Sequence, residues 1–201
     1  MKAAMEANFW GPVRVIRGVL PCMRAKKAGT IVSISSIFGF QACPALAMYC
    51  VPKAAQDILQ LVLKAELAMF NIRPITITAG LYRTNVFTNS KQPVNGFGNT
   101  YMAGSLGKTI TDSVKMAEDP TQIPGDPGKF GERIVDIVDC TGLGAGLEKT
   151  TRFLLGRDAI YLSGLRMAEL REDFKSTEAI ATSTDFEGHT GRGVGIIGDY
   201  L

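Results

Sequence analysis

The stretch Thr30–Lys53, TIVSISSIFGFQACPALAMYCVPK, decides how this chain folds. Its first residues, Thr30–Ser35, alternate and are rich in β-branched side chains, which predicts a strand. A loop over 37–46 follows, and then a long helix over 46–70. Because Pro52 lacks an N–H and would clash with the carbonyl four residues back in a formed helix, we expect that helix to begin only about one turn before it.

A second strand is predicted over Pro74–Ala79, PITITA, with proline at the first position, where its missing N–H is tolerated. Strand, long helix and strand form one βαβ unit, so the two strands are expected to be parallel with a right-handed crossover. Within the helix 46–70, apolar residues at helical spacing are expected to face the core: Ile58, Leu61, Val62 and Ala65.

The first 27 residues have the apolar period of a helix, which Gly29 ends. Pro12 falls inside this pattern and deprives the Asn8 carbonyl of its helical partner. Two interpretations remain open. Either the helix runs through Pro12 with a kink and a free carbonyl at Asn8, or it starts later with Pro12 in its first turn.

Residues 80–126 are polar and rich in Gly, Pro, Asn and Thr, which is typical of a functional lid or of disorder, with one helix near 107–118. Three further elements are expected downstream: a helix over 127–140 with Ile134, Val135 and Val138 on one side, a short strand over Phe153–Leu155, and a charged helix over Asp158–Lys175.

Composition narrows the function classes. The chain has 201 residues and 46% hydrophobic residues, enough for one domain with a core. A net charge of +3 without a Lys/Arg cluster argues against nucleic acid, and no apolar run is long enough for a membrane span. Four cysteines without a CxxC pair predict free thiols in a reducing compartment, the cytoplasm. The single histidine, His189, stands in a glycine-rich tail, which leaves a Ser-His-Asp hydrolase without a usable base.

Three groups in the opening stretch are suited to proton chemistry. Tyr49 and Lys53 are spaced i, i+4, so they share one face of the predicted helix. An ammonium nearby is expected to lower the tyrosine pKa from about 10 by roughly 1–3, which makes a general acid/base. Ser36 ends the strand 13 residues before Tyr49 and supplies a hydroxyl for a carbonyl oxygen. A YxxxK pair alone is usually an ordinary surface pair, but this combination is more specific.

These motifs together resemble the short-chain dehydrogenase/reductase family. NFWG from Asn8 is similar to its N-x-x-G, TIVSISSIFGF to its I-V-N-I-S-S-x-x-G, and Tyr49–Lys53 to its Y-x-x-x-K. ITAGLYRT is similar to I-x-P-G-x-x-x-T, with Ala79 in place of the proline. Downstream, PGDPGK, RFLLGRDA and STDF resemble a carbonyl-reductase-like, NADP-preferring branch, so the likeness extends over residues 1–187.

The resemblance implies an α/β fold, namely the C-terminal half of a Rossmann-type, doubly wound parallel sheet with about three strands between long helices. Residues 1–187 would form one partial domain and 188–201 a disordered glycine-rich tail. The implied activity is interconversion of a small-molecule carbonyl and its alcohol, with NADP or NAD as cofactor. Family members commonly dimerise through the helices that correspond to 1–27 and 46–70, so a homodimer is expected.

Carried over by resemblance, Tyr49 donates a proton to the carbonyl, and Lys53 lowers its pKa and contacts the nicotinamide ribose. Ser36 orients the carbonyl, and the main-chain carbonyl of Asn8 holds a water that links Lys53 to solvent. Pro52 replaces a usual serine before the lysine, which puts the position of Lys53 in question. Three residues after the second strand would contact the cofactor: Gly80, Tyr82 and Thr84.

The family's T-G-x-x-x-G-x-G and N-N-A-G motifs do not precede Asn8. If Met1 is the true start, the adenine half of the cofactor site is missing and the strand Thr30–Ser35 has an open edge. TGLGAG over Thr141–Gly146 follows a helical pattern, so it is expected to be a helix cap and loop, not a phosphate loop. The alternative function is therefore a truncated, inactive remnant that acts as a dimerising or interaction protein, or a fragment of a gene model.

Overall fold

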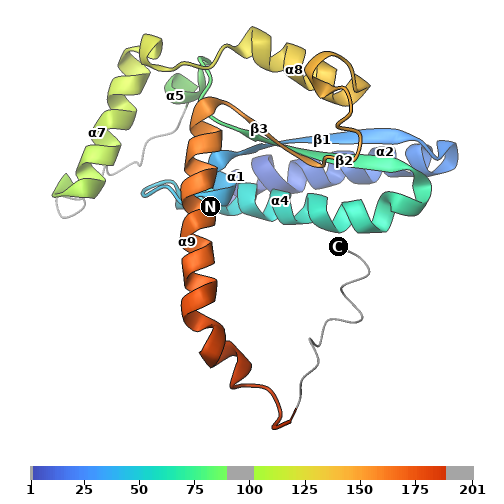
Figure 1. Ribbon diagram of the computed structural model, residues 1–201. Coiled ribbons are helices and arrows are strands. Elements are labelled where there is room, and N and C mark those ends of the chain that lie inside the picture. Colours follow the sequence, from blue (N-terminus) through green and yellow to red (C-terminus); the bar gives the residue numbers. More distant parts are fainter. Residues whose placement is uncertain (1, 90–101, 189–201) are drawn as a thin grey trace.

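A computed structural model describes residues 2–89 and 102–188, and its centre is a three-stranded parallel sheet (Figure 1). The strands are β1 (Gly29–Ser36), β2 (Ile72–Ala79) and β3 (Arg152–Leu155), in the order β1-β2-β3. Ser36 pairs with Ala79, which in turn pairs with Leu155. All three strands therefore end at one edge of the sheet, and the α/β prediction is confirmed.

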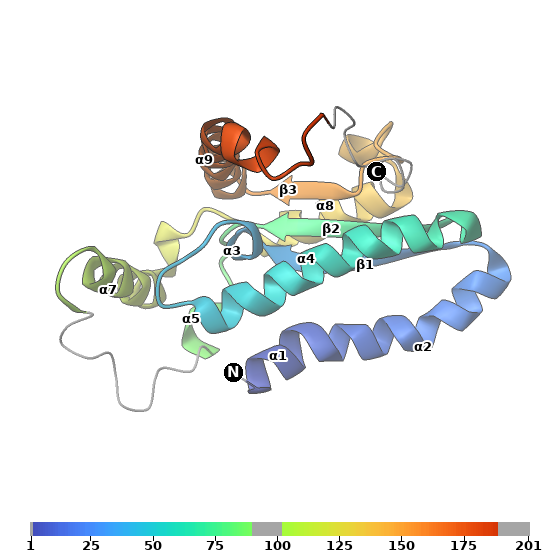
Figure 2. The same ribbon diagram turned by 90° about the horizontal axis from the view of Figure 1, so that it is seen from below.

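Helices cover both faces of this sheet (Figures 1 and 2). One face carries the long helix α4 (Ala47–Leu67) and the N-terminal helix, and the other face carries α8 (Pro127–Asp139). The N-terminal helix has three parts: α1 (Lys2–Met5), the π-helical η1 (Glu6–Trp10) and α2 (Gly11–Lys26). The remaining elements are α3 (Ile37–Phe40), η2 (Ala68–Phe70), α5 (Val86–Asn89), α7 (Ser105–Glu118), η3 (Pro120–Gln122), η4 (Gly142–Gly144) and α9 (Arg157–Thr182).

The N-terminal helix combines the two interpretations of Pro12. The chain is already helical from Lys2, so the helix does run through this region. Before Pro12 it widens into a π-helical turn, in which the Gly11 N–H donates to the Glu6 carbonyl five residues back. Pro12 then lies in the first turn of α2, where a missing N–H costs least. The irregular turn is thus the structural response to proline within a helix.

Two apolar clusters hold the helices to the sheet. On one face, residues of α2 and α4 pack on β1 and the start of β2: Ile16, Leu20, Ile31, Leu63, Leu67 and Ile72. On the other face, α8 packs on β2 and β3 through Ile75, Ile77, Ile137 and Phe153. Burial of these side chains is the main favourable contribution to the fold.

The predicted core face of α4 is wrong. Ile58, Leu61 and Val62 are 61%, 49% and 46% exposed, and Ala65 is exposed as well. The residues that face the sheet include three polar ones: Gln56, Asp57 and Gln60. The helical period of the apolar residues was predicted correctly, but the side of α4 that faces the sheet was not. Polar residues of α4 are buried there because the opposing strands also present buried hydroxyl groups, those of Ser33, Ser35, Thr76 and Thr78.

Strand β2 starts two residues before the prediction, so Pro74 is its third residue. The N–H groups of Thr76 and Gly80 donate toward β3, to Thr151 and Leu155. Alternate residues of a strand bond to the same neighbour, so Pro74 also faces the β3 side. Because β3 pairs only from Thr76 onward, the missing N–H of Pro74 removes no ladder bond.

The second half follows the predicted order with some different boundaries. Helix α7 confirms the helix near 107–118, while residues 90–101 of the expected lid lie outside the described residues. In α8, Val135 is exposed and Ile137 is buried instead. Helix α9 extends seven residues past Lys175, and the predicted tail lies outside the described part of the chain from residue 189. No described helix has the length and apolar character that a membrane crossing requires.

Candidate active site

The candidate site lies where the strands end. Ser36 is the last residue of β1 and is extended, with φ −146° and ψ 154°. Its side-chain oxygen accepts the N–H of Phe38 at 3.2 Å and so caps the one-turn helix α3. The residue is buried. The Ser36 hydroxyl is therefore fixed at the carboxyl edge of the parallel sheet, where ligands of such folds usually bind.

Tyr49 lies in the first turn of α4 and is hydrogen-bonded to Ser36. Burial raises the pKa of Tyr49 above its usual range, the Ser36 hydrogen bond opposes this effect, and nearby Cys50 adds to it. The net direction is upward. The expected lowering of the Tyr49 pKa by Lys53 is therefore not found in this structure, because desolvation of the phenol dominates.

Lys53 follows one turn later on the same helix. Its Nζ donates to the carbonyl oxygen of Ile34 at 2.8 Å and lies 5.8 Å from the centre of the Tyr49 ring. Burial lowers the pKa of Lys53, and the charge of Asp57 opposes that shift. Pro52 is buried and does not displace the lysine from Tyr49. Tyr49 and Lys53 thus lie close together, as their spacing indicated, and Ser36 lies beside them.

Gly39 lets this arrangement close. A Cβ at this position would lie 3.0 Å from the backbone carbon and the Cβ of Lys53. Such contacts are tighter than nearly all real ones, so a side chain here requires movement. The glycine of the predicted loop is therefore what allows α3 to pack directly on α4 beside Lys53.

The other predicted residues are only partly brought to the site. Asn8 lies in η1, which packs against α4, and its side-chain Nδ2 donates to the Ala4 carbonyl at 3.1 Å. Gly80 follows β2 and its N–H donates to Leu155 at 2.8 Å, which places it at the same sheet edge as Ser36. The water-holding role of the Asn8 carbonyl and the cofactor contact of Gly80 stay predictions.

Tyr82 and Thr84 point elsewhere. The ring of Tyr82 packs on Phe130 of α8, with centroids 4.4 Å apart, and burial raises its pKa with a further contribution from Asp158. Thr84 is exposed. The loop that carries them is tied to the start of α9 instead, because the Leu81 N–H donates to the Asp158 carboxylate at 2.6 Å. Asp158 also fills the space where a side chain at position 80 would lie.

The glycine-rich segment Thr141–Gly146 is a cap and loop, as predicted. It follows α8, whose last residues connect to the start of β2 through Arg73, which binds the Ile137 carbonyl. This is the amino end of the strand, opposite the edge that holds Ser36. Gly142 also faces the carboxylate of Asp136, a poor neighbour for a phosphate.

The sequence reasoning missed a buried ion pair next to the site. Arg152 of β3 binds Asp57 of α4 at 2.7 Å and the Thr78 hydroxyl of β2 at 2.8 Å. The Asp57 side chain is only 6% exposed. The position of Asp57, four residues after Lys53, could have indicated that it lies near the site. It was missed because the face with Ile58, Leu61 and Val62 was expected to pack on the core instead.

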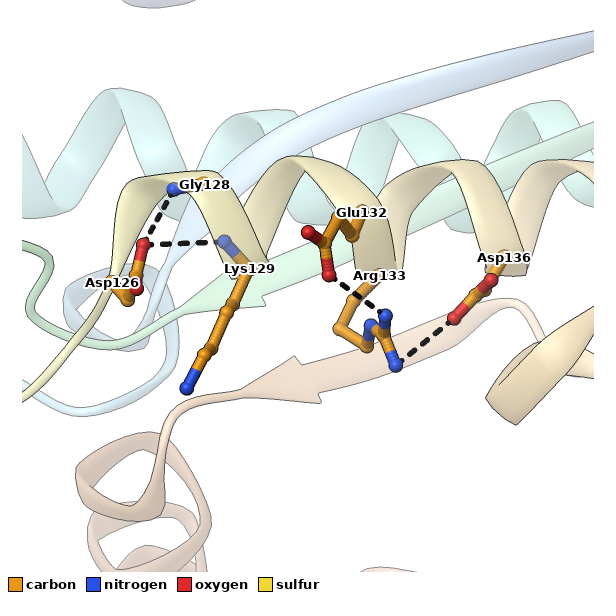
Figure 3. A network of polar contacts seen from close by, with 6 residues as sticks. All are labelled: Asp126, Gly128, Lys129, Glu132, Arg133 and Asp136. Carbon is orange, nitrogen blue, oxygen red and sulfur yellow. Dashed lines mark hydrogen bonds and ion pairs between the residues drawn. The ribbon is translucent and has the colours of Figure 1, made fainter.

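A hollow of about 330 Å³ lies beside α8, the end of β3 and the start of α9. Figure 3 shows that α8 carries its polar groups in a row, in which Asp126 caps the helix and Arg133 bridges Glu132 and Asp136. The hollow is lined by charges of both signs, among them Asp126, Lys129, Arg157 and Asp158. The hollow therefore has no single charge preference.

Comparison with known proteins agrees with the family that the sequence motifs indicate. The family model described as short chain dehydrogenase matches residues 1–95. The chain belongs to the short-chain dehydrogenase/reductase family. That family comprises oxidoreductases that use NAD(P), which agrees with a site built on Ser36, Tyr49 and Lys53.

Three similar proteins define the extent of the match. An oxidoreductase claN from Passalora fulva is 39% identical over 44% of this chain and 41% of its own length. Oxidoreductase BOA17 from Botryotinia fuckeliana is 32% identical over 81% of this chain and 55% of its own length. A solved short-chain dehydrogenase from Streptomyces avermitilis is 27% identical with a TM-score of 0.74, over 90% of this chain and 62% of that one. This family member thus spans about half the length of the curated relatives it matches.

Proposed function

We propose that this chain is an NAD(P)-dependent oxidoreductase that interconverts a small-molecule carbonyl and its alcohol. The observation that carries the proposal is the convergence of Ser36, Tyr49 and Lys53 at the carboxyl edge of the sheet. Tyr49 and Lys53 lie one turn apart on α4, and Ser36 comes from the end of the adjacent strand β1.

Each residue has a role that follows from its environment. Tyr49 is fully protonated near neutral pH because its pKa is raised, so it acts as the proton donor in carbonyl reduction. The buried Ser36 hydroxyl orients the carbonyl oxygen beside Tyr49. Lys53 uses one ammonium proton on the Ile34 carbonyl and keeps two further donors for the hydroxyls of a ribose.

The described residues fit the nicotinamide and ribose end of such a cofactor. Lys53 and Tyr49 would hold the ribose, with Gly80 near the nicotinamide, and the bound cofactor would supply the hydride. NADP is proposed in preference to NAD because the downstream motifs resemble an NADP-preferring branch. The proposed location is the cytoplasm, where four free thiols stay reduced.

Titration of the purified chain with NADPH, and separately with NADH, tests this proposal through nicotinamide fluorescence. We expect a dissociation constant well below about 1 mM, preferentially for NADPH, and loss of binding in Lys53→Met. The matched control is Lys175→Met on the exposed end of α9, which should bind as the parent does. If neither dinucleotide binds at millimolar concentration, the oxidoreductase proposal fails for this chain and the non-catalytic interaction protein replaces it.

We also propose that the chain forms a homodimer through α2 and α4. Both helices expose apolar side chains on their outer faces: Val15, Val19, Val51, Ile58, Leu61 and Val62. An apolar surface of this kind marks a protein interface. Light scattering after size exclusion should give twice the chain mass for the parent and one chain mass for Leu61→Glu. The control Ile180→Glu, which changes an equally exposed apolar residue on the distant end of α9, should stay dimeric. A monomeric parent contradicts the dimer.

A further inference from the structure

We propose that Asp57 is a positioning residue of the site, whose buried carboxylate, held by Arg152, keeps Lys53 charged and directed along α4 toward Tyr49. The inference rests on the proposed function for the meaning of Lys53, but its geometry is independent of any cofactor.

The first observation is alignment. Tyr49, Lys53 and Asp57 succeed one another at intervals of four residues on α4. Side chains at this spacing lie on one face of a helix, one turn apart. Lys53 is therefore flanked by the reacting phenol on one side and by a carboxylate on the other. The Lys53 Nζ is fixed between these two turns by its hydrogen bond to the Ile34 carbonyl.

The second observation is the cost of the charge. Asp57 is 5% exposed, and a buried carboxylate is stable only when it is paired. One oxygen, Oδ2, accepts from Arg152 at 2.7 Å. The other, Oδ1, is buried and has no hydrogen-bond partner among the described residues. Apolar residues could fill this space at lower cost, so the carboxylate stands there at the expense of stability.

The third observation is the electrostatic environment of the Lys53 ammonium group. Burial favours the neutral amine and lowers the Lys53 pKa, and the Asp57 charge acts against this effect. The uncharged amine would bind a ribose less well and would no longer favour an ionised phenol at Tyr49. Asp57 thus offsets the cost of placing a cation in a half-buried site.

The neighbouring elements leave Asp57 as the main countercharge. Strand β3 contributes Arg152, a second cation, and β1 and β2 contribute the hydroxyls of Ser36 and Thr78. Helix α3 carries no ionisable side chain. From η1, Glu6 is exposed and paired with Arg14 of α2. Arg152 fixes the carboxylate in place but also weakens its pull on Lys53.

This arrangement predicts opposite effects from the two members of one ion pair. Asp57→Asn removes the negative charge while keeping the size, so the Lys53 pKa should fall by about one, a tenfold loss of proton affinity. Arg152→Gln removes the competing cation, so the Lys53 pKa should rise. Both changes remove the same ion pair, and a merely structural role would move the two variants in one direction.

The test is NMR titration of the full chain with ¹³C-labelled lysine, in which Lys53 is assigned from the signal lost in Lys53→Met. The control is Asp173→Asn on the exposed part of α9, which should leave the Lys53 titration unchanged. An unchanged Lys53 pKa in Asp57→Asn, or shifts of the same sign in both variants, overturns the proposal. If Asp57→Asn does not fold, Arg152→Gln alone decides by the sign of its shift.

The titration needs no dinucleotide, so its outcome separates from that of the proposed function. Opposite shifts in a chain that binds no NADPH support the Asp57 proposal and refute the oxidoreductase proposal. Binding of NADPH without the shifts in the Lys53 pKa supports the oxidoreductase proposal and refutes the Asp57 proposal. In a chain that turns over substrate, Asp57→Asn should also move the pH profile of kcat/KM, whereas Asp57→Glu should restore it.

Discussion

The two faces of α4 differ in a way that reverses the usual pattern of a surface helix. Its inner face presents Gln56, Asp57 and Gln60 to the sheet, all buried. Its outer face presents Ile58, Leu61 and Val62 to the outside. In an ordinary amphipathic helix the apolar stripe faces the core and the polar residues face water.

This reversal teaches that α4 serves two structures at once. The apolar contacts that fix it to the sheet are concentrated near its C-terminal end, in Leu63 and Leu67. Between these contacts and the turns that carry Tyr49 and Lys53, the inner face is polar. The outer apolar face is left for another protein surface, which we propose is a second copy of the chain.

The largest difference between the faces should be in stability. Leu67 is 0% exposed, and Leu67→Ala should lower the free energy of unfolding by about 2–5 kcal/mol because it leaves a cavity. Leu61→Ala, the same change on the outer face, should cost less than about 1 kcal/mol in the monomer. Urea unfolding at low protein concentration measures both. Equal losses would mean that the outer face is packed.

A smaller effect is expected where α3 touches the inner face. Gly39→Ala places a methyl group 3.0 Å from the Lys53 backbone and should destabilise the protein by about 1–3 kcal/mol. Gly164→Ala in α9 has no neighbouring atom within 4 Å and should stabilise it by about 0.4–1 kcal/mol. Thermal unfolding of the two variants compares them. A stabilised Gly39→Ala would refute the close packing of α3 on α4.

The smallest expected effect is a pH dependence, with opposite signs for two residues of one helix turn. The Lys53 pKa is lowered in the folded state, so its unfavourable contribution is complete below that value and disappears as pH rises toward about 10.4. The Tyr49 pKa is raised, so its favourable contribution is complete below about 10 and is lost as pH rises through the folded value.

Relative to the parent, Lys53→Met should therefore lose stability as pH rises toward about 10.4, and Tyr49→Phe should gain it above about pH 10. Urea unfolding at a series of alkaline pH values measures both slopes. The exposed Tyr161 provides the control, because Tyr161→Phe should follow the parent curve. Parallel curves for all three variants would show that burial does not perturb Tyr49 or Lys53.

Much of the fold was accessible from the sequence because it depends on local pattern. The strand β1, the helices α4, α7 and α8 and the proximity of Tyr49 and Lys53 were predicted correctly. The proton-transfer role of this pair and of Ser36 stays a prediction. The orientation of α4 was not predicted correctly, because periodicity shows that one face is apolar but not which partner covers it. The boundary at Pro74 was missed because it depends on where β3 begins, far along the chain.

The sequence by itself determined the family, the α/β order and the groups able to carry protons, because these follow from residue type and short-range spacing. Only the tertiary structure decided their environment. It buried Tyr49 and so raised its pKa, it directed Tyr82 to α8, and it brought Arg152 to Asp57 from 95 residues away. Desolvation and long-range pairing depend on what surrounds a residue in space, and neighbours in sequence do not specify them.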